Sequence, residues 1–337
     1  MLKLNDYWYI AAPSSELRKK PIRRELEGET IVLFRDSAGK ACALEDRCRH
    51  RGMALSEGQV RNGCVECPYH GWRYSATGEV AHVPALLEGE TLGGCGKVRS
   101  FFTQERDEHI WIWLGKEEPT TEPLGFPHCG DSGWQTFFMH TRFNAPVESC
   151  LENFLDVPHT IFVHPGLFRN EDQKETKLRI HSEGDSVEVA FLDETPLAGL
   201  GPRLVFPRDT SMSHTDRFIL PATTRVDYGF GEEHRFIITS QCTQRQESVV
   251  DVTTAITWRL PIPSFVVKPF LKFYCRRVIQ QDVEVLDILG KQLKKFGNTM
   301  THTRADVLGR HISRLRRRAA EGLHSNPRFT EEQSLRI

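Results

Sequence analysis

The chain has 337 residues, a formal net charge of −1, 26% charged residues and 39% hydrophobic residues. At about 100–200 residues per domain, this length favours two domains of a globular protein. The near-neutral charge argues against a general electrostatic attraction to nucleic acid or to an anionic membrane. The sequence also contains no run of about 18 apolar residues, so no membrane-spanning helix is expected.

The N-terminal segment and the cysteines indicate a protein of a reducing cytoplasm. Residues 1–17 carry Asp6 and Glu16 and lack the long apolar core of a signal peptide. The nine cysteines follow no spacing typical of secreted proteins. Those outside the motifs described below are expected to be reduced and mostly buried.

Residues 1–118 are expected to form an all-β domain. Four short runs of β-branched and aromatic residues are bounded by Gly, Asp or Pro: YWYIAA, TIVLFRD, KACALED and HIWIWLG. The stretch WRYSATGEVAHV predicts a hairpin whose turn contains Thr77 and Gly78. Residues 119–133 are rich in Pro, Gly and acidic residues and are expected to be a linker.

Two Cys/His pairs lie in this first domain. Cys48 precedes His50 by two positions, Cys67 precedes His70 by three, and sixteen residues separate the pairs. Two facing loops of this kind would suit a structural zinc ion or a Rieske [2Fe–2S] cluster, in which two cysteines hold one iron and two histidines the other. Zinc ribbons usually carry Cys-x2-Cys pairs, so the observed spacing favours the Rieske cluster. Cys64 is expected to be a buried apolar cysteine rather than half of a zinc pair.

The stretches CRHRG at 48–52 and CPYHGWRY at 67–74 resemble the Rieske domain of ring-hydroxylating and demethylating oxygenases. The resemblance implies that Cys48 and Cys67 bind one iron of a [2Fe–2S] cluster and that His50 and His70 bind the other. Neutral imidazoles in place of thiolates raise the reduction potential of such a cluster.

Residues 134–337 are expected to form an α+β domain with an antiparallel sheet and flanking helices. Its expected helices are 146–163, 268–296 and 304–320, and its expected strands lie near 187–192, 217–220, 235–241 and 249–260. Pro146 suits the first turn of the first helix.

The stretch ENFLDVPHTIFVHPG contains the second group of candidate ligands. Asn153, Asp156 and His159 are spaced three apart, so neighbours in this row would touch on a helix. His159 and His164 would diverge by about 140° on an ideal helix. Both can face one ion only if the helix distorts or ends between them. A mononuclear iron site also needs a carboxylate.

Asp282 is the candidate carboxylate. On a wheel of about 100° per residue, it lies within a stripe of apolar residues, which are Val278, Val285, Leu286, Leu289, Leu293 and Phe296. A carboxylate in an apolar stripe is costly unless it is paired or binds a metal. The alternative to a metal ligand is a buried salt bridge with an arginine. A set of His159, His164 and Asp282 would be the 2-His-1-carboxylate triad of non-haem Fe(II) enzymes.

The pattern Asn-x2-Asp-x2-His-x4-His, followed by a distant Gln-Asp on a helix, resembles the catalytic domain of Rieske oxygenases. The resemblance implies that Asp156 accepts a hydrogen bond from His159 and acts as the catalytic bridge to His70 of a neighbouring subunit in a homotrimer. Asn153 is a further candidate beside the ligands.

The chain length and the ENFLDVPH context are similar to single-subunit-type oxygenases such as vanillate O-demethylase and dicamba monooxygenase. This resemblance implies a Rieske monooxygenase that uses O2 to hydroxylate, or to O- or N-demethylate, a small organic substrate. No Gly-x-Gly-x-x-Gly fingerprint occurs, so NAD(P)H is expected on a separate reductase, with or without a ferredoxin. Arg47, Arg49, Arg51 and Arg73 could receive an acidic partner, although solvated surface charge is the more common explanation.

Three alternatives share part of this pattern. A cis-dihydroxylating dioxygenase α subunit would use the same ligands. A Rieske electron carrier or metal-stabilised binding protein would not need His159, His164 and Asp282. A zinc-binding nucleic-acid module would use the basic run RLRRRAA at 314–320, but the near-neutral charge argues against it.

Overall fold

The computed structural model describes residues 2–87, 90, 96–165, 174–193, 210–297, 301–323 and 327–337. The chain forms two compact units, each with its own core. One consists of residues 5–125 together with 243–246, and the other consists of residues 1–4, 126–242 and 247–337. Among the described residues, we find no helix with the length and apolar character needed to cross a membrane.

The first unit is all-β, as the sequence predicts. A six-stranded antiparallel sheet has the order β1-β10-β9-β4-β3-β2, and a four-stranded sheet has the order β5-β6-β7-β8. The bounds are β1 Trp8–Pro13, β2 Ile22–Leu26, β3 Glu29–Arg35, β4 Ala41–Glu45, a 3-10 turn at Leu55–Glu57, β5 Gln59–Arg61, β6 Cys64–Glu66, β7 Arg73–Tyr74, β8 Val80–His82, β9 Ser100–Arg106 and β10 His109–Trp113.

Each of the four apolar runs noted in the sequence lies on a strand of the larger sheet. Strand β10 is buried along its whole length, and the interior of β3 is buried as well. The expected hairpin forms between β7 and β8, and Gly78 takes a φ of 82° in its turn. Strands β6 and β7 pair antiparallel, so the chain between them, residues 67–72, projects as a loop from one end of the smaller sheet.

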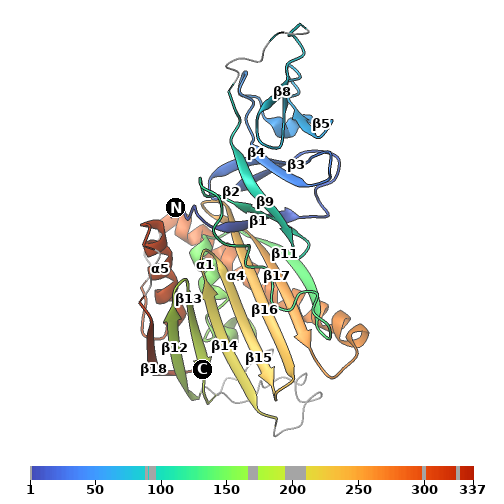
Figure 1. The fold of residues 1–337 in the computed structure, drawn as a ribbon. Helices are drawn as coiled ribbons and strands as arrows, with labels where there is room; N and C mark the ends of the chain where they lie inside the picture. Colours follow the sequence, from blue (N-terminus) through green and yellow to red (C-terminus); the bar gives the residue numbers. More distant parts are fainter. Residues whose placement is uncertain are drawn as a thin grey trace. The chain divides into compact units, whose positions relative to one another are not determined.

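The second unit is an eight-stranded antiparallel sheet with helices, which confirms the predicted α+β class. The strand order is β11-β17-β16-β15-β14-β13-β12-β18. Helices α1, α4 and α5 lie on one face of this sheet (Figure 1). The bounds are β11 Gln135–Phe143, α1 Val147–Asn153, α2 Thr160–Val163, β12 Glu175–Glu183, β13 Ser186–Phe191, β14 Met212–Ile219, β15 Thr223–Phe230, β16 His234–Gln246, β17 Val249–Arg259, α4 Ser264–Phe296, α5 Val307–Ala320 and β18 Phe329–Arg336.

The expected single helix over 146–163 is wrong. Helix α1 ends at Asn153, residues 154–159 form turns, and α2 is one short turn from Thr160 to Val163. Pro158 explains the break, because a proline disfavours helical geometry in the residue before it and cannot donate a helical hydrogen bond.

The long helix α4 begins at Ser264, four residues before the expected start, and it contains Pro269. Asp282 is buried with Leu286, as the wheel predicts. The apolar stripe is shorter than expected, because Val285 and Phe296 are exposed. One buried face therefore carries Asp282 towards the sheet.

Candidate metal centres and the cavity beside one of them

The two Cys/His loops of the first unit have matching backbones. In each loop, the amide of a glycine donates to the carbonyl of the cysteine four positions earlier: Gly52 to Cys48 at 2.9 Å and Gly71 to Cys67 at 3.0 Å. Both glycines have positive φ values, 77° and 68°, which side chains disfavour. The two turns therefore share one backbone hydrogen bond, although His50 follows its cysteine by two positions and His70 by three.

The four candidate ligands divide into a buried pair and a more accessible pair. Cys48 and Cys67 are buried, whereas His70 is exposed and His50 is half-buried. The rings of His50 and His70 lie 4.5 Å apart, and Trp72 stacks on His50 at 4.8 Å. The buried Nδ1 atom of His50 has no hydrogen-bond partner among the described residues. A buried imidazole nitrogen without a hydrogen-bond partner is suited to bind a metal ion.

The spacing of these side chains favours a cluster over a single zinc ion. Tetrahedral zinc, with bonds of about 2.0–2.3 Å, brings its ligand atoms within about 4 Å of one another. Within the described parts of the chain, only His159, His164 and Asp282 form a group of three or more His, Cys, Asp or Glu residues whose ligand atoms all lie within 4.8 Å. Two thiols and two neighbouring imidazoles on a pair of similar loops, those of Cys48, Cys67, His50 and His70, fit a Rieske group with two metal ions.

Tyr74 contacts this site and was not singled out by the sequence. Its hydroxyl lies 3.1 Å from Cys48 Sγ and accepts a hydrogen bond from the amide of Arg49 at 3.0 Å. The phenolic proton is therefore available for the sulfur. Burial raises the pKa of the Cys67 thiol, so a cation is needed to hold that sulfur as a thiolate at neutral pH.

In the second unit, the break between α1 and α2 brings the second group of residues together. His159 stands at the start of α2, His164 stands just after its end, and Asp282 faces both from α4. Asp282 Oδ1 lies 3.1 Å from His164 Nε2 and 3.6 Å from His159 Nε2. Helix α2 ends at Val163, and His164 leaves helical geometry with φ −119° and ψ 55°. The helix therefore ends between the two histidines, which is the condition under which residues five apart can face one ion.

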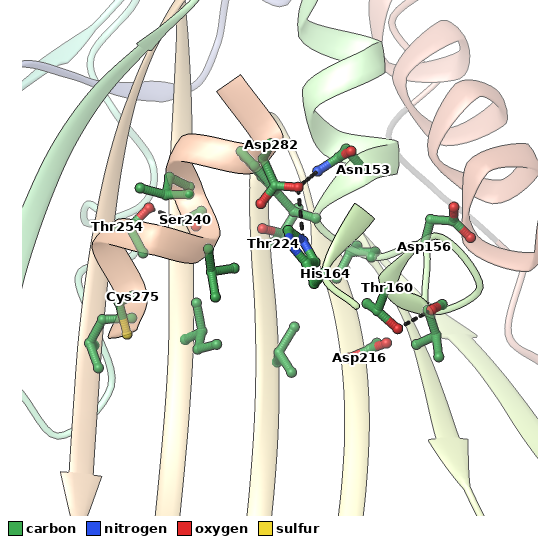
Figure 2. Close-up of a pocket in the computed structure, with 18 of the residues that line it drawn as sticks. Asn153, Asp156, Thr160, His164, Asp216, Thr224, Ser240, Thr254, Cys275 and Asp282 are labelled. Carbon is green, nitrogen blue, oxygen red and sulfur yellow. Dashed lines mark hydrogen bonds and ion pairs between the residues drawn. The ribbon is translucent and has the colours of Figure 1, made fainter. Parts of the chain in front are cut away.

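Neighbouring groups fix the orientation of all three side chains. The Nδ1 atom of His164 donates to Gln281 Oε1 at 3.0 Å, and that of His159 donates to the backbone carbonyl of Asp156. Asn153 Nδ2 donates to Asp282 Oδ1 at 3.0 Å, and Figure 2 shows this contact beside the one from His164. Because both imidazoles use Nδ1 as the donor, both Nε2 atoms point at the carboxylate. Such an arrangement is stable only with protons or a cation between them.

The pKa shifts reflect the same arrangement. Burial alone would raise the pKa of Asp282, but the imidazoles of His159 and His164 and the amide of Asn153 outweigh it and lower the pKa to about 2. Burial alone would lower the pKa of His164, but Asp282 raises it overall. The carboxylate is therefore an anion at neutral pH, as a ligand for a divalent cation must be.

Asp156 differs from its expected contact with His159. Its backbone carbonyl, rather than its carboxylate, accepts the hydrogen bond, and Oδ2 lies 3.7 Å from His159 Nδ1. The turn at 154–159 explains this, because it directs the carbonyl of Asp156 towards the ring. Burial raises the pKa of the Asp156 carboxyl, and Asp306 adds to the rise. The side chain stays available for another partner.

A cavity of about 150 Å³ lies beside His159, His164 and Asp282 (Figure 2). Its walls come from the α1–α2 segment, from α4 and from the sheet face formed by β14 to β17. Phe154 and Leu155 line it, as their positions in the sequence suggested, whereas Phe162 is exposed and does not. The lining side chains are mostly apolar: Met139, Val226, Tyr228, Phe236, Ile238, Ile256, Val278 and Ile279 are among them. The space suits a small organic molecule.

Two family models match the chain. The Rieske [2Fe-2S] domain matches residues 7–101, and the vanillate O-demethylase oxygenase C-terminal domain matches residues 143–321. Solved structures with the same fold include dicamba monooxygenase bound to 3,6-dichlorosalicylic acid, with a TM-score of 0.81 and 20% identity over 95% of this chain and 98% of that one. The structure of Pseudomonas putida NdmA with caffeine also has a TM-score of 0.81 and 20% identity, and the match covers 97% of this chain and 96% of that one.

Curated relatives are more similar in sequence over shorter stretches. Aminopyrrolnitrin oxygenase PrnD of Pseudomonas fluorescens is 33% identical over 48% of this chain and 46% of its own length. The dicamba O-demethylase oxygenase component of Stenotrophomonas maltophilia is 33% identical over 49% and 48%, respectively. The vanillate O-demethylase oxygenase subunit of a Pseudomonas strain is 30% identical over 53% and 50%. The chain thus matches about half the length of these relatives.

Proposed function

The chain belongs to the family of Rieske proteins that carry the vanillate O-demethylase oxygenase C-terminal domain, and from this premise we propose that it is the oxygenase component of a Rieske-type monooxygenase. It hydroxylates, or O- or N-demethylates, a small organic substrate with O2. The observation that carries this proposal is the convergence of His159, His164 and Asp282 at the wall of a mostly apolar cavity. An electron carrier needs neither the triad nor the cavity.

The side chains fit the two metal centres that this activity requires. Cys48, His50, Cys67 and His70 would hold a Rieske [2Fe–2S] cluster, and His159, His164 and Asp282 would hold a mononuclear Fe(II). A triad of this kind leaves coordination positions open for dioxygen and substrate. The bare Nδ1 of His50 and the two Nε2 atoms aimed at Asp282 support this assignment.

The surrounding residues prepare the second site for chemistry. Gln281 and the carbonyl of Asp156 hold the two imidazoles as Nδ1–H tautomers, so that each Nε2 lone pair stays free for a metal. Asn153 holds the carboxylate of Asp282 in place. The apolar walls exclude water from the substrate and bring its reacting carbon beside the triad.

Electron supply and assembly belong to the same proposal. A separate NAD(P)H-dependent reductase, with or without a ferredoxin, reduces the cluster. Asp156 is the catalytic bridge that links His159 to His70 of a neighbouring subunit in a homotrimer. The carboxyl of Asp156 is partly exposed, and His159 does not use its hydrogen-bonding capacity, which supports that role. No disulfide joins the eight cysteines of the described residues, and a reducing cytoplasm is the compartment that belongs to this proposal.

The test compares two aspartates of helix α4. Wild-type protein, isolated without oxygen, should hold about three irons and about two acid-labile sulfides per chain. Asp282→Ala should keep the cluster colour, lose the third iron and lose product formation. Asp287→Ala is the matched control, because Asp287 lies on the same helix away from the cavity, where its exposed contacts are with Lys291 and the side chain of Asn144. It should behave like the wild type.

Product analysis with a generic reductase decides the reaction class. Formaldehyde or a singly hydroxylated product supports the monooxygenase, whereas a cis-diol identifies a dioxygenase. Protein that contains zinc alone, without labile sulfide, would refute the proposal. Iron retained in full by Asp282→Ala would place the mononuclear site elsewhere.

A further inference from the structure

A second buried acid–base pair lines the same cavity and is not used by the proposed metal site. His214 and Asp216 lie on β14, two positions apart, so their side chains share one face of the sheet. Both are almost fully buried. His214 Nε2 donates to Asp216 Oδ1 at 3.0 Å. The imidazole is stacked between Phe191 at 4.2 Å and Tyr228 at 4.4 Å, which fixes its position and with it that of the carboxylate.

One oxygen of Asp216 has no hydrogen-bond donor among the described residues. His214 contacts only Oδ1, and no other hydrogen bond or ion pair to Asp216 occurs in the described part of the chain. Asp216 lines the cavity, and Figure 2 shows it below Thr160, away from Asp282. This oxygen keeps some exposure to the cavity, and leaving a carboxylate oxygen without a donor in so apolar a space has a free-energy cost. A bound molecule that donates to this oxygen would remove that cost.

The charges around the cavity select the kind of molecule. Three carboxylates line it, those of Asp156, Asp216 and Asp282, and no lysine or arginine does so among the described residues. Asp282 faces the two histidines, which leaves Asp216 as an acceptor on another wall. An aryl carboxylate or sulfonate would meet the Asp216 carboxyl group, and no lysine or arginine of the described lining would offset its charge. An ammonium, amide N–H or hydroxyl group would find an acceptor held in place.

From this geometry we infer that Asp216, positioned by His214, binds the substrate by accepting a hydrogen bond from it. The substrate class is then a small organic molecule that carries a hydrogen-bond donor, as a cationic nitrogen or as a neutral N–H or O–H group, rather than a carboxylate. This inference rests on the proposed function only in calling the bound molecule a substrate. The hydroxyls of Thr224, Ser240 and Thr254, which line the same cavity, add further polar contacts for such a molecule.

Three probes with one methoxyphenyl skeleton test the inference. They are 4-methoxybenzylamine, 4-methoxybenzyl alcohol and 4-methoxybenzoate, which present an ammonium, a neutral donor and an anion in the same place. Binding to the full-length, metal-loaded protein is measured by calorimetry without oxygen, and turnover is measured separately as formaldehyde. We expect the amine or the alcohol to bind at least about tenfold more tightly than the benzoate. Tighter binding of the benzoate to the wild type would overturn the inference whatever the variants do.

Asp216→Asn identifies the residue responsible. It should weaken binding of the favoured donor probe by about tenfold or more relative to the benzoate. If only the amine loses affinity, the group that Asp216 recognises is a cation. If the amine and the alcohol lose affinity equally, that group is a neutral hydrogen-bond donor. Asp227→Asn is the matched control. Asp227 lies on the adjacent strand β15 and pairs with Arg225, and it is not among the residues that line the cavity.

An unchanged preference among the probes in Asp216→Asn would overturn the role of Asp216. A purely structural defect in Asp216→Asn would lower the melting temperature and weaken the binding of all three probes alike, and that result would also count against the inference. The proposed function is decided separately. Donor selectivity without the third iron or formaldehyde would support the inference and refute the monooxygenase. Formaldehyde formed from the benzoate in preference to the amine would support the monooxygenase and refute the inference about Asp216.

Discussion

Gly290 provides a sharp test of how α4 is held in place. It is buried on α4, and a Cβ atom added there would lie only 1.9 Å from the backbone oxygen of Asn144 and 3.2 Å from Ala145 Cα. Ordinary contacts of this kind begin at 3.4 Å. Helix α4 thus approaches the segment that leads into α1 more closely than any side chain at position 290 would permit.

The expected effect of Gly290→Ala is the difference between two opposing contributions. Replacing glycine by alanine inside a helix gains about 1 kcal/mol of helix propensity. Overpacking a buried contact costs about 1–3 kcal/mol. The upper end applies here, because neither alanine nor a backbone carbonyl can rotate away. The net destabilisation is about 2 kcal/mol, which for a unit of this size lowers the melting temperature by about 4–8 °C.

The same substitution should weaken the proposed iron site. Asp282 lies about two helical turns before Gly290, so retreat of α4 from Asn144 displaces its carboxylate from His159 and His164. Calorimetry and iron analysis of the purified variant measure the two effects together. We expect a lower melting temperature, a substoichiometric third iron and a cluster spectrum that does not change.

Gly309→Ala is the matched control on α5. A Cβ atom there would lie 3.1 Å from Glu152 Oε1 and otherwise meets only atoms of the same flexible side chain. We expect the free energy of unfolding of Gly309→Ala to equal that of the wild type or to exceed it by up to about 1 kcal/mol. If Gly290→Ala is as stable as Gly309→Ala and keeps its third iron, the close approach of α4 to Asn144 is refuted.

Three further predictions concern individual contacts. Tyr74→Phe removes the hydroxyl beside Cys48 Sγ and should lower the midpoint potential of the cluster by about 60 mV, equivalent to about 1.4 kcal/mol, in a redox titration; an unchanged potential would contradict it. Asn153→Ala removes a donor to Asp282 and should weaken Fe(II) binding about 10–100-fold in a metal titration, whereas unaltered affinity would show that the amide is dispensable. In metal-free protein, the folded-state pKa of Asp282 is lowered to about 2, so its ionisation contributes about 2 kcal/mol of unfolding free energy above about pH 4, and this is lost as the pH falls towards 2. Denaturant titrations of wild type and Asp282→Asn should show their difference shrinking across that window, and a constant difference would exclude the contribution.

The Rieske domain and the α+β class were predictable because their signals are local. Cysteine and histidine are uncommon, and the two loops place glycine at the same offset from each cysteine, at Gly52 and Gly71. The family comparisons confirm the Rieske domain and the oxygenase domain that follows it. The buried face of α4 was predictable for a similar reason, since helical periodicity alone placed Asp282 in an apolar setting.

The prediction of one helix over 146–163 failed because it followed residue spacing and gave too little weight to Pro158. The proline lies before both histidines, and the turn there separates the short helix α2 from α1. The signal was present in the sequence. The relative orientation of His159 and His164 depends instead on the end of α2 at Val163, which lies between them.

The cavity could not be predicted, because strands distant in sequence build it. Its sheet wall depends on the pairing of β14 to β17. The register between these strands cannot be predicted from the sequence of any single strand. Even so, His214-x-Asp216 carried a local signal, since residues two apart on a strand share a face. The expected strand at 217–220 began too late to include the pair. The proposed iron ligands come from short motifs on helices and turns, whereas the proposed substrate contacts come from alternating positions on paired strands. The reaction class is therefore easier to predict from this sequence than the substrate, which depends on contacts such as that of Asp216.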